Sequence, residues 1–356
     1  MAYGTLQILD TLAANRQYIA AYGEDNAYRA IQQYLNAHNE IVQMMLGDLA
    51  EDTTDRLRRY GGVDAMQMIE GDEFSSPDVQ KLLPGVNVGF PLKLYQIGLQ
   101  WTKKYQQTHT VAELAGQVTA AMTADVRRIQ TELKKAFFNP VNNLNYLDRL
   151  VDNLNLPLRA LLNADGTQIP ADPYGNVFNP ATHTHYLATA TPALADVLGL
   201  IATVLEHYND GAVKVYINQG SEAFVRSLAG TSAGVGFTPY VDTRIIPQTT
   251  QSVGEAPLNM MNVYNRAIGV LGAAEVWVKP WIPANYMFAF NPNQRKPLAR
   301  RTRDGVSGDL HIAAELDQYP LHAQYMEREF GVGVQERTNG AVLCLNNATY
   351  QAPASY

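Results

Sequence analysis

Hydrophobic residues recur every three or four positions in three long stretches of the chain, which predicts three amphipathic helices. Residues 25–51 carry one such stripe and residues 192–208 carry another. The third, residues 110–138, begins with Thr110-Val-Ala-Glu113, a capping-box pattern in which each of these two side chains bonds to the backbone amide of the other. At about 1.5 Å per residue this helix would be roughly 40 Å long, which suits a spine that spans the whole molecule.

A strict alternation of apolar and polar residues over 85–104 predicts a long β ribbon. Apolar side chains occupy even-numbered positions up to Leu94 and odd-numbered positions from Tyr95 onward. A slip of one residue moves the apolar set to the other face, so we expect a bulge or bend at this point. A ribbon with one apolar face is a liability in an isolated domain, whereas in an assembling protein it can dock on a neighbour.

Shorter strand patterns dominate the second half of the chain. The segment VKVYI, residues 213–217, predicts a strand that is followed by a turn and by a short helix over 221–228. Further strands are expected near 266–271, 275–278 and 286–290.

The end of the chain, Gln324 to Tyr350, predicts two long strands joined by a tight turn. Asn339-Gly340 lies between them, and this dipeptide supplies the positive φ angles that a two-residue hairpin turn requires. We therefore expect a closing β-hairpin.

Composition narrows the class of protein. The 356 residues are 46% hydrophobic and 17% charged, which is typical of a globular chain with room for two domains. The formal net charge of −7 argues against a protein built to grip nucleic acid. The lone Cys344 is interpreted as a buried apolar residue in a reducing compartment. Neither a signal peptide nor an apolar run of about 18 residues is found, so we expect no membrane span.

One pair of residues deserves consideration as a metal site. His183-Thr-His185 places two imidazoles on the same face of an extended segment. A metal site also needs a third ligand and a buried surrounding shell. Asp165 and Asp172 are near in sequence, but turn motifs already account for them. The sequence therefore predicts no metal site.

Motifs for cofactor binding and catalysis are missing. Gly234-Val-Gly236 and Gly331-Val-Gly333 lack the third glycine and the strand-to-helix context of a dinucleotide loop. Neither a phosphate-binding loop nor a Gly-x-Ser-x-Gly nucleophile elbow occurs. We accordingly expect no catalytic residues and no cofactor, and interpret the chain as a structural protein.

A single basic cluster lies in the sequence NPNQRKPLARRTRDG. It lacks interleaved aromatic residues, so stacking on nucleic-acid bases is not expected. Contact with a neighbouring subunit is favoured, and a solvated loop and contact with nucleic acid remain alternatives. The cluster comprises Arg295, Lys296, Arg300, Arg301 and Arg303.

The order of the expected elements is more informative than any single motif. A helical N-terminal arm is followed by the ribbon, the capped helix, a helix–strand–turn–helix unit and a final pair of strands. This order resembles the Hong Kong 97-like fold of the major capsid proteins of tailed bacteriophages, an α+β fold. The segments that carry the resemblance are VKVYINQGSEAFVRSL, EVWVKPWIPANYMFAFN and EREFGVGVQERTNGAVLCL.

Turn signals predict short hairpins within residues 140–190, a segment that is longer than the minimal fold needs and is interpreted as an insertion. The resemblance implies five parts of the chain. The parts are an N-terminal helical arm (1–60), an extended loop formed by the β ribbon (61–108), a peripheral domain with the spine helix and the insertion (109–190), an axial domain (191–305) and return strands of the peripheral domain (306–356).

The function implied by the resemblance is that of a major capsid protein, made in the host cytoplasm, whose pentamers and hexamers form the icosahedral shell of a virion. The shell would enclose double-stranded DNA without sequence-specific binding, and scaffolding, portal and decoration proteins are the expected partners. We expect the ribbon and the basic cluster to contact neighbouring subunits. In the ribbon the expected interface residues are Phe90, Leu92, Tyr95, Ile97, Leu99 and Trp101.

Other functions remain open at this point. An encapsulin-like compartment shell would share the fold but would enclose protein cargo. A metal-dependent hydrolase would use His183 and His185. A tail-tube or adhesin protein would form tubes or trimers rather than spheres.

Overall fold

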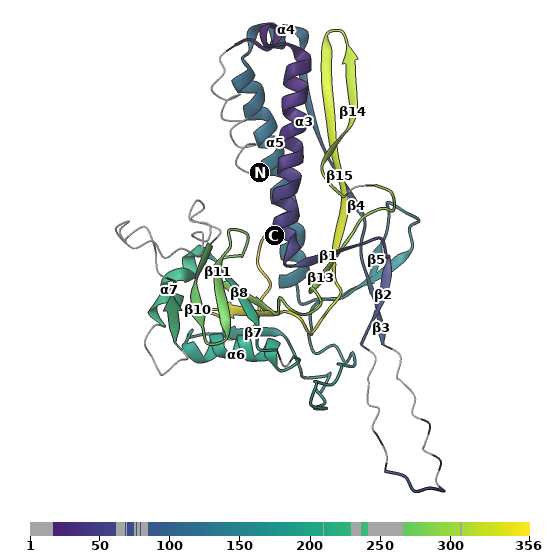
Figure 1. The fold of residues 1–356 in the computed structure, drawn as a ribbon, viewed down its shortest axis with the longest axis vertical. Coiled ribbons are helices and arrows are strands. Elements are labelled where there is room, and N and C mark those ends of the chain that lie inside the picture. Colours follow the sequence, from purple (N-terminus) through teal and green to yellow (C-terminus); the bar gives the residue numbers. More distant parts are fainter. Residues whose placement is uncertain are drawn as a thin grey trace.

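The computed structural model of the chain describes residues 17–61, 85–208, 210–228, 236–240, 266–306 and 308–356, together with 68, 70–74, 76 and 79. The first sixteen residues of the expected arm, and parts of the expected extended loop and axial domain, lie outside the described residues. Figure 1 shows an elongated part, built from two long helices and a narrow sheet, beside a more compact part built on a second sheet.

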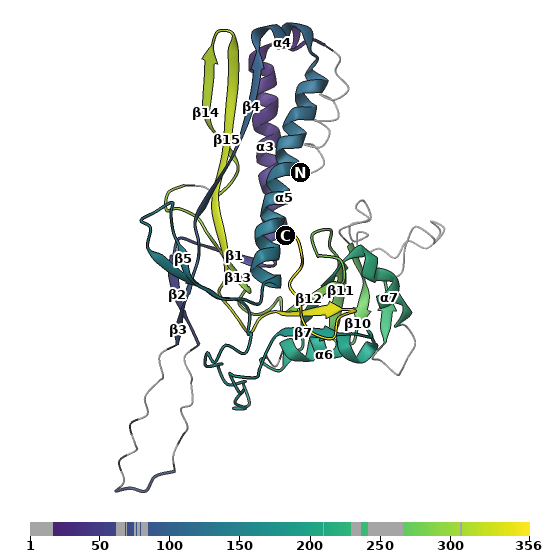
Figure 2. The ribbon, with the colours of Figure 1, turned by 180° about the vertical axis from the view of Figure 1, so that it is seen from behind.

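Two long helices lie side by side in the elongated part (Figures 1 and 2). They are α3 (Glu24–Gly47) and α5 (Val111–Phe138). The capping box at the start of α5 is confirmed, because the Thr110 side chain accepts from the Glu113 amide and Glu113 accepts from the Thr110 amide. The apolar stripes of the two helices meet in a shared core that also includes Trp101. The short helices α2 (Ile19–Tyr22) and α4 (Lys103–Thr108) lie near one end of this pair.

A narrow five-stranded sheet runs along these helices. Its longest strand, β15 (Leu321–Val334), pairs antiparallel with both β14 (His311–Gln318) and β4 (Lys93–Thr102). The last residues of β15 pair with β13 (Leu298–Arg301), which pairs in turn with β1 (Ala50–Thr53). The sheet therefore joins segments from the beginning, middle and end of the chain.

The compact part is built on a seven-stranded sheet with the strand order β7-β16-β12-β8-β11-β10-β9. Helix α6 (Leu194–Leu205) packs against it through fully buried aliphatic side chains, and α7 (Glu222–Ser227) follows a single 3₁₀ turn, η1 (Gln219–Ser221). The strands are β7 (Tyr186–Thr189), β8 (Val213–Ile217), β9 (Phe237–Pro239), β10 (Arg266–Leu271), β11 (Ala274–Val278), β12 (Tyr286–Phe290) and β16 (Ala341–Leu345). The expected VKVYI strand and the three strands that follow it are confirmed.

Two small hairpins complete the described fold. Strand β2 (Leu57–Tyr60) pairs with β3 (Val86–Gly89), and β5 (Asn143–Leu147) pairs with β6 (Asn155–Leu158). The second pair lies within the segment where short hairpins were expected. Among the described residues, no helix combines the length and the apolar character needed to cross a membrane.

The predicted closing hairpin is wrong. Strands β15 and β16 belong to different sheets and do not pair with each other. Neither Asn339 nor Gly340 has a positive φ. Instead the buried Asn339 side chain donates to the carbonyls of Asn291 and Arg295 and accepts from the Asn291 amide. These bonds hold the connection between β15 and β16 against the segment that follows β12.

The single ribbon expected over 85–104 is also corrected. Its first part, β3, pairs with β2, whereas its second part, β4, pairs with β15. The chain changes partner at Phe90-Pro91-Leu92, and β4 continues without a bulge through Leu94 and Tyr95. The slip in the apolar pattern is therefore not a bulge, because Leu94 lies on the exposed face of β4, opposite the face that carries Tyr95.

Candidate subunit interface

The paired strands β2 and β3 lie beside β5 at one side of the molecule in Figures 1 and 2. Its base is fixed by Arg58 of β2, whose guanidinium donates to Thr53 and Gln335 at 2.7 Å each and forms an ion pair with Asp55 at 2.6 Å. Because these partners come from β1, the following turn and the end of β15, the hairpin is anchored to the five-stranded sheet.

A close backbone contact holds the segment after β3. A methyl group added at Gly331 would lie 1.9 Å from the carbonyl oxygen of Pro91, and one at Gly333 would lie 2.8 Å from that of Gly89. Glycine is therefore required on this stretch of β15 so that the segment 89–91 can lie directly against it. The Gly-Val-Gly pattern in the sequence reflects this packing.

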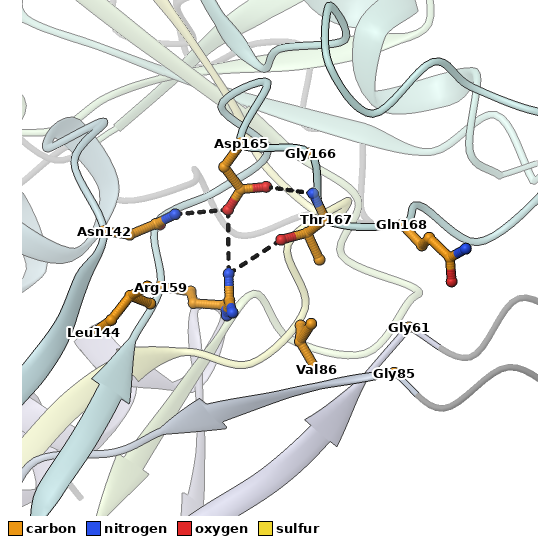
Figure 3. A pocket seen from close by; sticks show the side chains of 10 residues that line it. All are labelled: Gly61, Gly85, Val86, Asn142, Leu144, Arg159, Asp165, Gly166, Thr167 and Gln168. Carbon is orange, nitrogen blue, oxygen red and sulfur yellow. Dashed lines mark hydrogen bonds and ion pairs between the residues drawn. The ribbon is translucent and has the colours of Figure 1, made fainter.

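A hollow of about 410 Å³ lies where the hairpin leaves the body, lined in part by Gly61 and Gly85 (Figure 3). On its other side Arg159 donates to Asp165 at 3.3 Å and to Thr167 at 3.0 Å, as Figure 3 shows. Burial alone would raise the pKa of Asp165, but the nearby Arg337 charge and the hydrogen bonds from Thr167 and Arg337 outweigh it and lower the pKa to about 2. The carboxylate therefore stays charged and holds Arg159, whose Nε donates to the carbonyl of Asn87 in β3 at 3.3 Å, at the base of the hairpin.

The connection between β2 and β3 exposes large apolar side chains. Phe74 is 92% exposed, Val79 is 98% exposed and Met68 is fully exposed. A single exposed apolar residue is ordinary, whereas three among the described residues of one connection are more typical of a surface that takes part in binding. The sequence reading missed these residues because the segment shows no periodic pattern.

The apolar residues expected to dock on a neighbour are covered by this chain itself. Phe90, Leu92 and Trp101 are buried within this chain, whereas Tyr95, Ile97 and Leu99 are half-buried. Contact of this set with another subunit stays a prediction. The remaining members of the set pack on the same side of β4. Ile97 and Leu99 lie against the helix core, and the ring of Tyr95 contacts the tilted ring of Phe330 and the guanidinium of Arg128. The apolar face of β4 is therefore an internal face, and it is the helices α3 and α5 that cover it.

The basic cluster divides into internal and exposed members. Arg300 forms an ion pair with Asp52 and is buried, and Arg301 donates to Asp148 and to the carbonyl of Phe90 at 2.9 Å each. Both lie on β13, an inner strand, and so stabilise the chain rather than a contact between subunits.

The other three arginine and lysine residues of the cluster are more accessible. Arg295 and Arg303 are exposed, and Lys296 is half-buried. Arg303 forms an exposed ion pair with Glu329 at 2.8 Å, and Arg295 lies 3.5 Å from Glu51. These three remain candidates for contact with another subunit.

Comparison with known proteins identifies the fold. No family model and no curated protein matches the chain. Among solved structures, it is similar to a chain from Mycobacterium phage Patience, with 20% identity over 92% of this chain and 90% of that chain and a TM-score of 0.65. A capsid chain of cyanophage P-SCSP1u is 8% identical over 85% of this chain and 88% of that chain, with a TM-score of 0.49. A capsid chain of an empty GTA particle is 12% identical over 84% of this chain and 89% of that chain, with a TM-score of 0.47.

The likeness to the Patience chain covers nearly the whole of both chains. The fold is therefore α+β and of the Hong Kong 97-like type. The expected fold class is confirmed.

Proposed function

We propose that the chain is a major capsid protein that assembles with copies of itself into the closed shell of a bacteriophage head. The observation that carries this proposal is the anchored β2–β3 pair, whose connection exposes Met68, Phe74 and Val79. The shared fold with a chain of a mycobacteriophage supports the same assignment.

The energetics favour burial of this connection on a neighbour. Removing a large apolar side chain from water is worth about 1.5–3 kcal/mol, so three such residues supply a useful but modest driving force. Part of this gain is lost to immobilisation on binding. Modest contacts suit a shell, because a head-to-tail contact that closes into rings repeats many times and its total stability is large.

The parts of the fold then have distinct tasks. The hairpin is the extended loop, the elongated part with α5 is the peripheral domain, and the seven-stranded sheet is the centre of the axial domain.

Arg295, Lys296 and Arg303 contribute polar contacts at the rim of an interface. The net charge of −7 favours a wall that encloses DNA without adhering to it. Synthesis in the host cytoplasm and partnership with scaffolding, portal and decoration proteins belong to the same proposal.

Electron microscopy of the purified, full-length protein tests the proposal. We expect closed spherical particles with five- and six-membered rings of subunits. Tubes, trimers, or a chain that stays monomeric at high concentration would contradict it. The particle contents distinguish the two kinds of shell, because a phage head packages DNA when co-expressed with its packaging proteins, whereas a compartment shell encloses a specific protein.

A further inference from the structure

Four side chains that bind metals in other proteins converge between the base of α6 and the segment that precedes β7. They are His183, His185, Glu206 and His207, and their ligand atoms all lie within 4.8 Å of one another. The three imidazole Nε2 atoms form a triangle with sides of 3.0, 3.2 and 3.2 Å. Oε1 of Glu206 lies 3.4 Å from Nε2 of His183 and 3.9 Å from Nε2 of His207.

Hydrogen bonding cannot satisfy this arrangement of nitrogens. Nδ1 of His185 lies 2.7 Å from the carbonyl oxygen of Gly340, so it carries the proton and donates it, and Nε2 of the same ring is an acceptor only. If Nε2 of His183 and Nε2 of His207 each carried a proton, both protons would point at Nε2 of His185. The contact between His183 and His207 would then bring two N–H groups together. If only one of these two Nε2 atoms carried a proton, at least one of the three contacts would place two nitrogen lone pairs face to face.

A tetrahedral zinc ion accounts for all of these contacts. With zinc–nitrogen bonds of about 2.0 Å, neighbouring ligand atoms of a tetrahedron lie roughly 3.3 Å apart. The triangle of nitrogens is close to this spacing, and the Glu206 carboxylate is placed to supply the fourth corner. The bond from His185 to a backbone carbonyl is the outer-shell contact that fixes the ring of a metal-binding histidine.

The surroundings suit a neutral nitrogen ligand set and a bound cation. The imidazole rings of His185 and His207 are buried, so the protein rather than solvent surrounds these two nitrogens. The ring of Phe178 packs against His183 and His207, with centroids 4.8 and 4.4 Å away. Glu206 caps the C-terminal end of α6, where the helix dipole favours positive charge.

Backbone hydrogen bonds hold the histidines in place. The His185 amide donates to the Leu162 carbonyl at 2.8 Å, and the His185 carbonyl accepts from Val342 of β16 at 2.8 Å. The Ala164 amide donates to the carbonyl of His183 at 3.0 Å. The ligands are thus presented by a segment that is paired on both sides, rather than by a free loop.

We propose that His183, His185, Glu206 and His207 bind a structural zinc ion that cross-links the segment around 162–185 to the end of α6. Four protein ligands leave no coordination position for a substrate or an activated water, which distinguishes the site from that of a metal-dependent hydrolase. Imidazole and carboxylate ligands in tetrahedral spacing favour zinc over calcium or magnesium, which take more ligands and prefer oxygen. The site does not depend on whether the chain assembles.

Metal analysis of tag-free, full-length protein tests this proposal. We expect about one zinc ion per chain after purification in buffers without added metal, and loss of that zinc in His207→Gln and in Glu206→Gln. His311→Gln is the matched control, because His311 lies on β14 beside Glu327, with no part in the cluster, and its zinc content should equal that of the wild type.

A second measurement on the wild-type chain guards against variants that fail to fold. Cobalt(II) added to chelator-treated protein should give the intense visible absorption of a tetrahedral site, and zinc should abolish that absorption. Removal of zinc should lower the melting temperature by roughly 5 °C or more, and re-addition should restore it. Wild-type protein that holds no zinc and gives no tetrahedral cobalt spectrum would overturn the proposal, as would full zinc occupancy in His207→Gln.

Discussion

Arg328 of β15 forms a bidentate ion pair with Asp125 of α5, with both nitrogen–oxygen distances at 2.9 Å. Both side chains are buried, and Nε2 of His38 in α3 lies 2.8 Å from the same carboxylate. The pair therefore joins the two long helices to the central strand of the narrow sheet. His38 is itself buried and is part of this network.

We predict that Asp125→Ala lowers the free energy of unfolding by about 3–5 kcal/mol, because it leaves the Arg328 guanidinium buried without a counter-charge. Urea denaturation of the soluble subunit measures the effect. Lys103→Ala is the control, since its exposed pair with Asp317 spans 3.6 Å and should be worth less than about 1 kcal/mol. Equal losses in the two variants would contradict the assigned role of the buried pair.

The close contact at Gly331 leads to a second prediction. Gly331→Ala should destabilise the chain by about 3 kcal/mol or more, because the added methyl group would overlap the carbonyl of Pro91 and force β15 and the segment 89–91 apart. Gly116→Ala should instead stabilise by about 1 kcal/mol, because Gly116 lies inside α5 with open space around it. Melting temperatures of the two variants give the comparison, and a neutral Gly331→Ala would show that this contact is loose.

The arginines of β13 supply a third prediction. Arg301→Ala removes the closer of two arginine partners of Asp148, a carboxylate with no exposed surface, and leaves only Arg56 at 3.6 Å; it should lower the free energy of unfolding by about 3 kcal/mol. Arg303→Ala removes an exposed pair and should cost less than about 1 kcal/mol. Denaturant titration of the isolated subunits separates this effect on folding from any effect on assembly. Equal free energies of unfolding for Arg301→Ala and Arg303→Ala would contradict the internal role assigned to Arg301.

Acid stability should report on the base of the hairpin. Because the pKa of Asp165 in the folded chain, about 2, lies below its ordinary value, the charged form stabilises the fold above roughly pH 4, and this stabilisation is lost as the pH falls toward 2. Asp165→Asn should therefore reduce stability at pH 5 and flatten its decline between pH 4 and pH 2. Unfolding free energies measured across this range check the slope. An unchanged slope in the variant would assign the acid sensitivity to other carboxylates.

Sequence reasoning was most successful where local chemistry fixes the structure. Thr110 and Glu113 are three residues apart, and their mutual bonds depend on nothing beyond the first helical turn, so the start of α5 could be predicted. The strand VKVYI was equally clear, because β8 is largely buried in the middle of the seven-stranded sheet and its Val, Tyr and Ile residues all favour a strand.

Predictions failed where tertiary partners decide the outcome. Asn339-Gly340 has the composition of a hairpin turn, but the Asn339 side chain instead bonds to the carbonyls of Asn291 and Arg295, which no local pattern reveals. In the same way, the alternation in β4 revealed an apolar face but could not show that helices of the same chain cover it. His183 and His185 were visible as a pair, whereas Glu206-His207 stands at the end of a helix twenty residues later and joins them through the fold alone.

The exposed apolar side chains in the hairpin connection lead to the prediction that most directly concerns assembly. Phe74→Asp should leave the folding of the subunit unchanged, because the side chain is 92% exposed and makes no contribution to the core. The same change should prevent closed particles, because it would place an unpaired charge in an apolar contact between subunits. Phe74→Leu keeps an apolar side chain of similar reach and should still assemble. Melting temperature and particle yield by electron microscopy measure the two properties separately. Normal particles from Phe74→Asp would remove the connection from the interface, whereas a lower melting temperature would mean that Phe74 packs within its own subunit.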